Sequence, residues 1–247
     1  MKYTIVVPTY IGHLRQVELF LESFERFCLD KDSFEIKLII SKNESHFFDA
    51  LTKKYERVCN LSVVNLSDIL KQEEGVEVDE PKLLAQVGKF NFQSLKKIYA
   101  VKHFNTGTIL VLDSEALMIR PVVLGEIFEQ YRRDKFIVYT DLGTQKIQRD
   151  VAHTSFELIG KSFENLWFFE YDYWFFEKDL VDALFKHVLL TTGKTLYENL
   201  LVKNPIFEYN LYALYVYYFH KEKYRFLDSK KLLAHYLGDT LFEEYKI

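Results

Sequence analysis

Short apolar segments alternate along this chain with longer stretches in which apolar and polar side chains recur at helical spacing. The apolar segments are rich in Val, Ile and Leu and predict β-strands. They lie at residues 4–7, 34–41, 61–66 and 108–112. Helical spacing, typical of amphipathic helices, occupies residues 13–27, 46–58 and 90–104. Strands that alternate with helices in this way predict an α/β domain whose mostly parallel central sheet is flanked by helices.

Two further segments stand out in this pattern. The stretch from Lys71 to Pro81 predicts an exposed loop because it is strongly acidic. Its five carboxylates are Glu73, Glu74, Glu77, Asp79 and Glu80. Residues 211–219 are almost wholly apolar, which predicts a buried helix shorter than the ~20 residues that span a bilayer. Asn204 and Pro205 predict the start of that helix, because Asn caps helices and Pro fits their first turn.

The composition limits the classes of protein to which this chain can belong. A chain of 247 residues with 49% hydrophobic side chains suits one packed domain over residues 1–247. Lys plus Arg number 32 and Asp plus Glu 36, so the net charge of −4 gives no electrostatic reason to bind nucleic acid. Cys28 and Cys59 form no CxxC pattern, which disfavours a disulfide framework and a structural zinc site. The first apolar stretch is too short for a signal peptide, so we expect a cytoplasmic protein.

Candidate chemistry lies where the predicted strands end, because open α/β sheets bind ligands outside the carboxyl ends of their strands. The segments at these ends are Pro8-Thr9-Tyr10, Ser41-Lys42-Asn43 and Asp113-Ser114-Glu115. The chain has no GxGxxG after a strand, no GxxxxGK[ST] and no G-x-S-x-G. Dinucleotide-binding enzymes, P-loop kinases and α/β-hydrolases are therefore disfavoured.

The segment after the strand at 108–112 is the most informative, and it has two interpretations. Asp113 and Glu115 stand at i and i+2 where a buried strand meets solvent. Paired carboxylates there suit a divalent cation with a preference for oxygen, such as Mg²⁺ or Mn²⁺, which can bridge to a diphosphate. Alternatively, Asp113 caps a turn and Glu115 is solvated. The spacing alone does not choose between the two.

These segments together resemble the GT-A glycosyltransferases. The resemblance rests on Val-Val-Pro-Thr-Tyr at residues 6–10, on Ile-Ile-Ser at 39–41 and on Leu-Val-Leu-Asp-Ser-Glu-Ala-Leu-Met-Ile-Arg-Pro at 110–121. The helix carrying Gln93-Ser94-Leu95-Lys96-Lys97 is similar to the "QQ-x-x-KL" helix of a poorly characterised bacterial group, and Phe207-Glu208-Tyr209-Asn210-Leu211-Tyr212 resembles that group's "(S)EYELYG". Glu115 departs from the usual second Asp, and the segment at residues 207–212 lacks the usual Ser and the final Gly of that pattern.

The resemblance implies a GT-A (Rossmann-like) fold and a site for a nucleotide-sugar donor. Residues 1–121 become the nucleotide-sugar-binding half and 122–247 the acceptor-binding half. The donor would contact Pro8, Thr9, Tyr10, Ser41, Gln93, Lys96, Asp113 and Ser114, with Tyr10 able to stack on the base. Lys96 or Lys97 would reach a phosphate or the sugar, although a Lys pair on an amphipathic helix is commonly solvated, and we expect that of one of the two.

Two carboxylates are candidate catalytic bases. The resemblance directs Glu208 toward the sugar site, where it would take the proton of the acceptor hydroxyl. The other interpretation of Glu208 is a side chain that complements the helix dipole. Asp172 is the second candidate. For the metal, Mn²⁺ or Mg²⁺, the resemblance implies Asp113 and Glu115 as ligands and His235 as a third, against a purely structural role for that histidine.

The C-terminal region mixes basic and aromatic side chains. Its members are Lys221, Lys223, Arg225, Lys230 and Lys231, with Tyr217, Tyr218, Tyr224 and Phe226 among them. Such a surface suits anionic lipid headgroups or a lipid-linked acceptor, and predicts peripheral contact with the inner face of the membrane. The alternative interpretation is an ordinary solvated face, which is the commoner case for such a composition.

The combined prediction is a metal-assisted glycosyltransferase, most simply a hexosyltransferase. It would move a sugar from a nucleotide-sugar donor to a bacterial cell-surface glycan of the lipopolysaccharide, O-antigen or capsule type. Two alternatives stay open. One is a nucleotidyltransferase, which lacks here the expected Gly-rich loop after the first strand. The other is a non-catalytic nucleotide- or sugar-binding protein with a degenerate GT-A site, to which Glu115 in place of Asp points.

Overall fold

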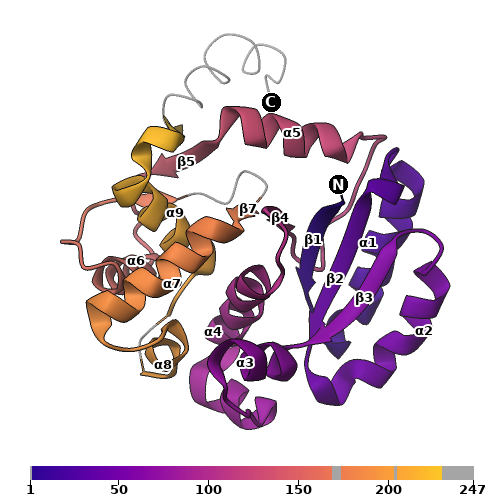
Figure 1. The fold of residues 1–247 in the computed structure, drawn as a ribbon, viewed down its shortest axis with the longest axis horizontal. Helices are drawn as coiled ribbons and strands as arrows, with labels where there is room; N and C mark the ends of the chain where they lie inside the picture. The colour runs from indigo at the N-terminus through magenta and orange to yellow at the C-terminus, as the bar shows by residue number, and fades with distance from the viewer. Residues whose placement is uncertain (1, 169–173, 203–204, 230–247) are drawn as a thin grey trace.

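A five-stranded, mostly parallel sheet forms the centre of the fold in a computed structural model that describes residues 2–168, 174–202 and 205–229 (Figure 1). The strand order is β3-β2-β1-β4-β7. The strands are β1 (Tyr3–Pro8), β2 (Phe34–Ile40), β3 (Asn60–Asn65), β4 (Thr108–Val111) and β7 (Trp174–Glu177). The first four pair in parallel, and β7 runs antiparallel to β4. The predicted fold class is therefore confirmed.

Helices cover both faces of this sheet. In Figure 1, α1 and α2 lie on one side of β1, β2 and β3, and α4 lies on the other. The helices are α1 (Leu14–Phe27), α2 (Ser45–Tyr55), α3 (Leu66–Glu74), α4 (Glu80–His103), α5 (Leu124–Asp134), α6 (Lys146–Leu158), α7 (Lys178–Thr192), α8 (Leu196–Val202) and α9 (Glu208–Phe219). None of the helices in the described ranges combines the length and the apolar character that crossing a membrane requires.

A smaller, three-stranded sheet has the order β6-β5-β8, and its strands come both before and after β7 in the chain. Its strands are β5 (Phe136–Thr140), β6 (Trp167–Phe168) and β8 (Arg225–Asp228). Helix α9 packs against β6 and against α4, α6 and α7. Its residues 208–216 are all buried, which confirms the predicted core helix. Pro205 lies outside it, because α9 begins at Glu208, so the predicted start at that proline is wrong; Asn204 lies outside the described residues.

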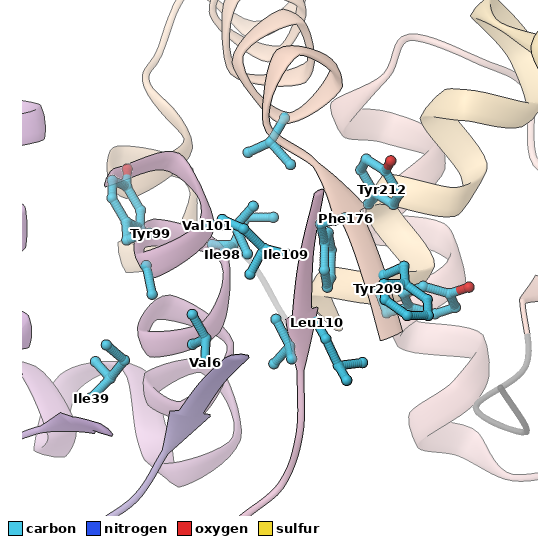
Figure 2. Packing of buried hydrophobic residues seen from close by; sticks show 14 of the residues in the cluster. Val6, Ile39, Ile98, Tyr99, Val101, Ile109, Leu110, Phe176, Tyr209 and Tyr212 are labelled. Carbon is cyan, nitrogen blue, oxygen red and sulfur yellow. The ribbon is translucent and has the colours of Figure 1, made fainter. Parts of the chain in front are cut away.

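The strands of the main sheet are continuous apolar runs because helices cover both faces of the sheet. Strands of a parallel sheet that is covered on both faces bury both sets of side chains, and Ile5, Val6 and Val7 of β1 have no exposed surface. Figure 2 shows Val6 and Ile98 between β1 and α4. On the β7 side, the Phe176 ring lies 4.8 Å from that of Tyr212 of α9.

The acidic stretch at 71–81 is not one exposed loop, as predicted, because both of its ends are helical. Helix α3 continues to Glu74, and the turn after it begins at Gly75, whose φ of 70° suits glycine. Helix α4 begins at Glu80, capped by the Asp79 side chain, which accepts a hydrogen bond from Lys82 N at 3.2 Å. Only the short segment between these helices is a loop, and Glu80 is buried because its carboxylate caps backbone N–H groups.

Candidate active site

A cavity of about 260 Å³ opens at the carboxyl ends of β1 and β2, against α4. Its walls are Thr9, Tyr10, Ser41, Glu44, Leu84, Lys89, Phe92, Gln93 and Lys96. Five side chains predicted to contact a donor come together here, although they derive from three segments far apart in the sequence. Pro8 does not line the cavity; it is the last, buried residue of β1.

Lys96 lies at the inner wall of this cavity, almost fully buried. Its Nζ donates a hydrogen bond of 2.7 Å to the backbone oxygen of Thr9, and it lies 5.2 Å from the centroid of the Phe92 ring. Burial lowers the pKa of Lys96 to about 8, although the negative charges of Glu44 and Glu80 oppose the shift. A buried amine with a readily changed charge is suited to hold an anionic or carbonyl-bearing ligand.

Two polar atoms near Lys96 have no hydrogen-bond partner within the described part of the chain. They are Thr9 Oγ1 and Glu44 Oε2, both buried. The other oxygen of Glu44, Oε1, accepts a hydrogen bond of 3.2 Å from Ile11 N. Leaving buried polar atoms unpaired is costly, so polar groups of a ligand could satisfy these two atoms.

The aromatic wall of the cavity is Tyr10. Its ring packs against His13 with 4.4 Å between the ring centroids, and the Lys89 ammonium lies 5.3 Å from the Tyr10 centroid. A Cβ atom on Gly12 would come within 2.4 Å of a Tyr10 ring carbon. Glycine at position 12 therefore lets the Tyr10 ring lie against the backbone of η1 (Ile11–His13).

His13 connects this cavity to the segment that follows β4. His13 Nδ1 lies 2.7 Å from Ser114 Oγ and 3.1 Å from Glu115 Oε1, and Ser114 donates to Glu115 Oε2 at 3.1 Å. Ser114 is buried, whereas the side chain of Glu115 is 53% exposed. Glu115 is thus an exposed side chain that also contacts two polar neighbours, which is compatible with either interpretation of this segment.

Lys97, next to Lys96 on α4, forms the centre of a second cluster. Its Nζ lies 3.0 Å from Asp113 Oδ1 and 3.2 Å from Glu208 Oε1, and 3.9 Å from the centroid of the Trp174 ring. Burial alone would lower the pKa of Lys97, but the charges of Glu208 and Asp113 outweigh burial and raise it. The ammonium thus joins the end of β4 to the start of α9.

Both lysines are buried, so the expectation that one of them lies on a solvated face is wrong. The reason is the position of α4, which packs against β1 and β2 on one side and against α7, α8 and α9 on another. Neighbouring residues of a helix point about 100° apart. Lys96 accordingly reaches the end of β1 while Lys97 reaches Asp113 and Glu208.

Glu208 is 1% exposed and is the first residue of α9. A carboxylate at that position complements the partial positive charge of the helix N-terminus. It also forms the ion pair with Lys97, so the helix-dipole interpretation and a role in the site do not exclude each other. Asp172, the second candidate base, lies outside the described residues.

The carboxylates after β4 are of the ligand type that a divalent metal ion would need. Asp113 and Glu115 carry the oxygen ligands that Mg²⁺ and Mn²⁺ prefer, and their side chains are 43% and 53% exposed. Within the described ranges, no group of three or more His, Cys, Asp or Glu side chains is arranged to hold a metal. His235, the third predicted ligand, lies outside those ranges.

The basic and aromatic C-terminal surface is smaller than predicted. Lys221 and Lys223 are exposed, and the Lys221 ammonium lies 4.7 Å from the centroid of the Tyr217 ring. Tyr224 is instead buried, with its hydroxyl 3.3 Å from that of Tyr212. The prediction of a surface position for Tyr224 is therefore wrong. Lys230 and Lys231 lie outside the described residues.

Sequence reasoning missed His13 and Glu44. His13 is a single histidine shortly after the first strand, and nothing in the local pattern marks it as a partner of Ser114. Glu44 had a usable signal, because it lies one residue beyond the Ser41-Lys42-Asn43 segment at the end of the second strand. Extending the search by one turn after each strand would have included it.

No protein-family model and no curated protein matches this sequence. Among solved structures, the fold is similar to apo mouse xyloside xylosyltransferase 1, with a TM-score of 0.49 and 11% identity over 92% of this chain and 85% of that one. Apo glycosyltransferase GlyE of Streptococcus pneumoniae TIGR4 gives a TM-score of 0.47 and 13% identity over 98% of this chain and 51% of its own.

The S. aureus TarS 1-349 chain in complex with UDP-GlcNAc gives a TM-score of 0.40 and 13% identity. The match covers 74% of this chain and 47% of the TarS 1-349 chain. This chain thus spans about half the length of the TarS 1-349 chain and of GlyE. At these identities and TM-scores the likeness assigns no family, so the chemistry has to be argued from the residues of the site itself.

Proposed function

We propose that this chain is a glycosyltransferase that uses a nucleotide-sugar donor. The observation that carries the proposal is the cavity with its unpaired polar atoms, joined through Tyr10 and His13 to the segment Asp113-Ser114-Glu115. An aromatic wall and buried polar atoms suit a nucleoside, and the cations and carboxylates beyond suit the diphosphate and the sugar. A donor extended across both parts would have its reacting bond near Lys97, Asp113 and Glu208.

The donor-binding roles follow from this placement. Tyr10 stacks on the base, and Thr9, Ser41, Gln93 and Lys96 supply hydrogen-bonding groups around it. Asp113 and Ser114 contact the ribose or the sugar. These assignments are part of the proposal and are tested by substitution.

A divalent cation belongs to the proposal. Asp113 and Glu115, together with His235, would hold Mn²⁺ or Mg²⁺, which supplies neutralisation of the charge that develops on the leaving nucleoside diphosphate. The side chains of the chain do the rest. Lys96 and Lys97 bring two further positive charges to the same end of the sheet, and His13 orients Glu115.

For the transfer step, we propose Glu208 as the base that takes the proton of the acceptor hydroxyl, with Asp172 as the alternative. Lys97 forms an ion pair with the buried Glu208, its Nζ lying 3.2 Å from Glu208 Oε1, and this contact positions the carboxylate. The substitution Glu208→Gln removes the charge and keeps the size. We expect it to abolish sugar transfer while donor binding persists, and full activity in this variant would contradict the assignment.

The acceptor side of the proposal is a bacterial cell-surface glycan of the lipopolysaccharide, O-antigen or capsule type, free or lipid-linked, with the enzyme in the cytoplasm at the membrane. The exposed Lys221 and Lys223 beside Tyr217 support contact with anionic headgroups. Co-sedimentation with phosphatidylglycerol vesicles at low salt tests this contact. Absence of binding at low salt would remove the membrane part of the proposal.

One observation favours the non-catalytic alternative. Asp113 and Glu115 are already paired, with Lys97 and with His13 and Ser114 respectively, and such pairing also suits a site that only binds. Turnover decides between the two functions. An enzyme releases nucleoside diphosphate from its donor in the presence of Mn²⁺ and acceptor, whereas a binding protein does not.

The first experiment is a thermal-shift panel of nucleoside diphosphates and nucleotide sugars with and without Mn²⁺. A ligand of the folded state raises the melting temperature as its concentration exceeds Kd. We expect a shift for one family of bases, reduced in Asp113→Asn. The matched control is Asp49→Asn, at an exposed position of α2. If none of the nucleotides raises the melting temperature of the folded protein, the proposal is overturned.

A further inference from the structure

Glu44 lies in the donor cavity as a fixed hydrogen-bond acceptor. It is the last residue of η3 (Lys42–Glu44), the short helix that follows β2, and its backbone N donates to Ser41 O at 2.9 Å. Oε1 is held by Ile11 N at 3.2 Å, which orients the carboxylate. Oε2 is buried and has no partner within the described residues. A carboxylate oxygen accepts hydrogen bonds, so the partner that Oε2 lacks would be an N–H or O–H group of a ligand in the cavity.

Two donors line the same cavity. Lys96 uses one of the hydrogens of its ammonium on Thr9 O, and two remain. The hydroxyl of Thr9 is buried and has no partner in the described ranges. Both can donate to one oxygen atom, because a carbonyl oxygen has two lone pairs whereas an aromatic ring nitrogen has one. The Tyr10 and Phe92 rings are also part of the cavity wall and suit a flat ring.

From this arrangement we infer that Glu44 determines which nucleobase the cavity accepts. The inference rests on the proposed function, since it supposes that the cavity holds a nucleoside diphosphate. Glu44 accepts a ring N–H, and Lys96 and Thr9 donate to the carbonyl oxygen beside that N–H. Uracil and guanine both carry this N–H next to a carbonyl. Adenine and cytosine present a ring nitrogen lone pair at the matching position, which a carboxylate repels.

The test measures the ratio of the affinities for different nucleotides. A general loss of structure weakens all of them alike and leaves this ratio unchanged. Isothermal titration with UDP, GDP, CDP and ADP, each with Mn²⁺, gives the dissociation constants. We expect UDP or GDP to bind at least about tenfold more tightly than CDP and ADP, since buried polar groups left unpaired reject the wrong ligand. The UDP and GDP arms separate the two bases that share the chemistry.

Two variants then identify the residue responsible. Glu44→Gln replaces the acceptor by an amide that can either accept or donate, so we expect the preference over CDP to fall at least about tenfold. Thr9→Val keeps the shape but removes a donor to the carbonyl, so UDP or GDP should lose more affinity than CDP, and this variant serves if Glu44→Gln does not fold. Glu56→Gln, the same change at an exposed position beyond the end of α2, should leave the ratio unchanged.

The outcomes separate the inference from the proposed function. Equal binding of UDP, GDP, CDP and ADP, or a preference that survives both Glu44→Gln and Thr9→Val, overturns the role of Glu44 and leaves nucleotide binding intact. Preference for ADP or CDP also overturns it. If the folded protein binds none of the four nucleotides, the proposed function fails together with the inference.

Discussion

At the scale of single residues, the site depends on two buried lysines with different partners. The Lys97 ammonium is shared between two carboxylates, the buried Glu208 and the half-exposed Asp113. Lys96 is the contrasting case, because its Nζ bonds a backbone carbonyl oxygen and its pKa falls with burial. Adjacent lysines of one helix thus have opposite pKa shifts, and two predictions follow from the difference.

The first residue-scale prediction concerns Lys97→Met. Removal of one member of a buried ion pair leaves the other charge uncompensated, which costs about 3–5 kcal/mol in the free energy of unfolding. We expect Lys97→Met/Glu208→Gln to be more stable than Lys97→Met alone, because the second change removes the unpaired charge. Urea unfolding of the two variants checks this. A double variant that is no more stable would mean that the pair contributes through packing instead.

The second concerns the pH dependence of stability at Lys96. Its pKa of about 8 in the folded protein lies below the ordinary value of 10.5, so the unfolded chain holds more protons between these values. Stability therefore rises with pH from about 8 to 10.5, by about 1 kcal/mol per pH unit. In Lys96→Met this contribution is absent. The unfolding free energies of wild type and variant are measured at pH 7.5, 9 and 10. As the pH rises, the wild type should gain stability relative to the variant.

At the scale of elements, α4 determines the geometry of the site. Its second half carries Phe92, Gln93, Lys96 and Lys97, while its first half brings Leu84 to the rim of the cavity. The two halves are separated by a kink at Gly88, which has φ 76° and ψ 164°. The positive φ interrupts the helix and sets the angle at which its first half meets the end of β2.

The prediction at this scale is that Gly88→Ala destabilises the protein by about 1–3 kcal/mol, because the combination of positive φ and extended ψ is essentially restricted to glycine. The cost comes from the backbone alone, since no atom lies within 4 Å of an added Cβ there. Gly107→Ala is the matched control: it also has open space around the added Cβ but no positive φ. Thermal unfolding should separate the two variants, and equal melting temperatures would show that the kink tolerates Ala.

At the scale of the whole molecule, α4 joins the parallel sheet to the helices α7, α8 and α9 (Figure 1). The site lies at this junction, since Tyr10 and Glu44 come from the sheet side and Glu208 from α9. Nearly all of the interior is apolar on both sides of α4. The two cysteines lie in this interior and report on its integrity.

We predict that Cys28 and Cys59 react with thiol reagents only when the protein unfolds. Both are free and buried, and burial raises the pKa of each thiol to about 12. The thiolate is the reactive form, so native labelling at pH 8 should be at least about a hundredfold slower than in denaturant. Ellman's reagent with and without 6 M urea measures this. Fast labelling of one thiol in the native protein would instead reveal local opening around it.

The amino-acid sequence by itself determined the four parallel strands of the main sheet and several of the segments that line the candidate site. Strands at 4–7, 34–41, 61–66 and 108–112 were predictable because β-branched runs and helical periodicity are local properties of the chain. The segments at 8–10, 41–43 and 113–115 were predictable because the carboxyl ends of parallel strands share one edge of a sheet. The Gln93 and Lys96 assignments came from the resemblance, and the structure places both in the same cavity as Tyr10.

Only the tertiary structure decided which of these groups are buried and which are paired. Thr9 and Lys96 are 87 positions apart, and His13 and Ser114 are 101 apart. No local pattern encodes such contacts, because they depend on how α4 packs between the sheet and α9. The same packing removes water from both lysines, which lowers the pKa of Lys96, and it brings Lys97 to Glu208 and Asp113, whose charges outweigh burial and raise its pKa. The sequence therefore determined where chemistry could occur, and the packing of distant segments decided the charge and partners of each group.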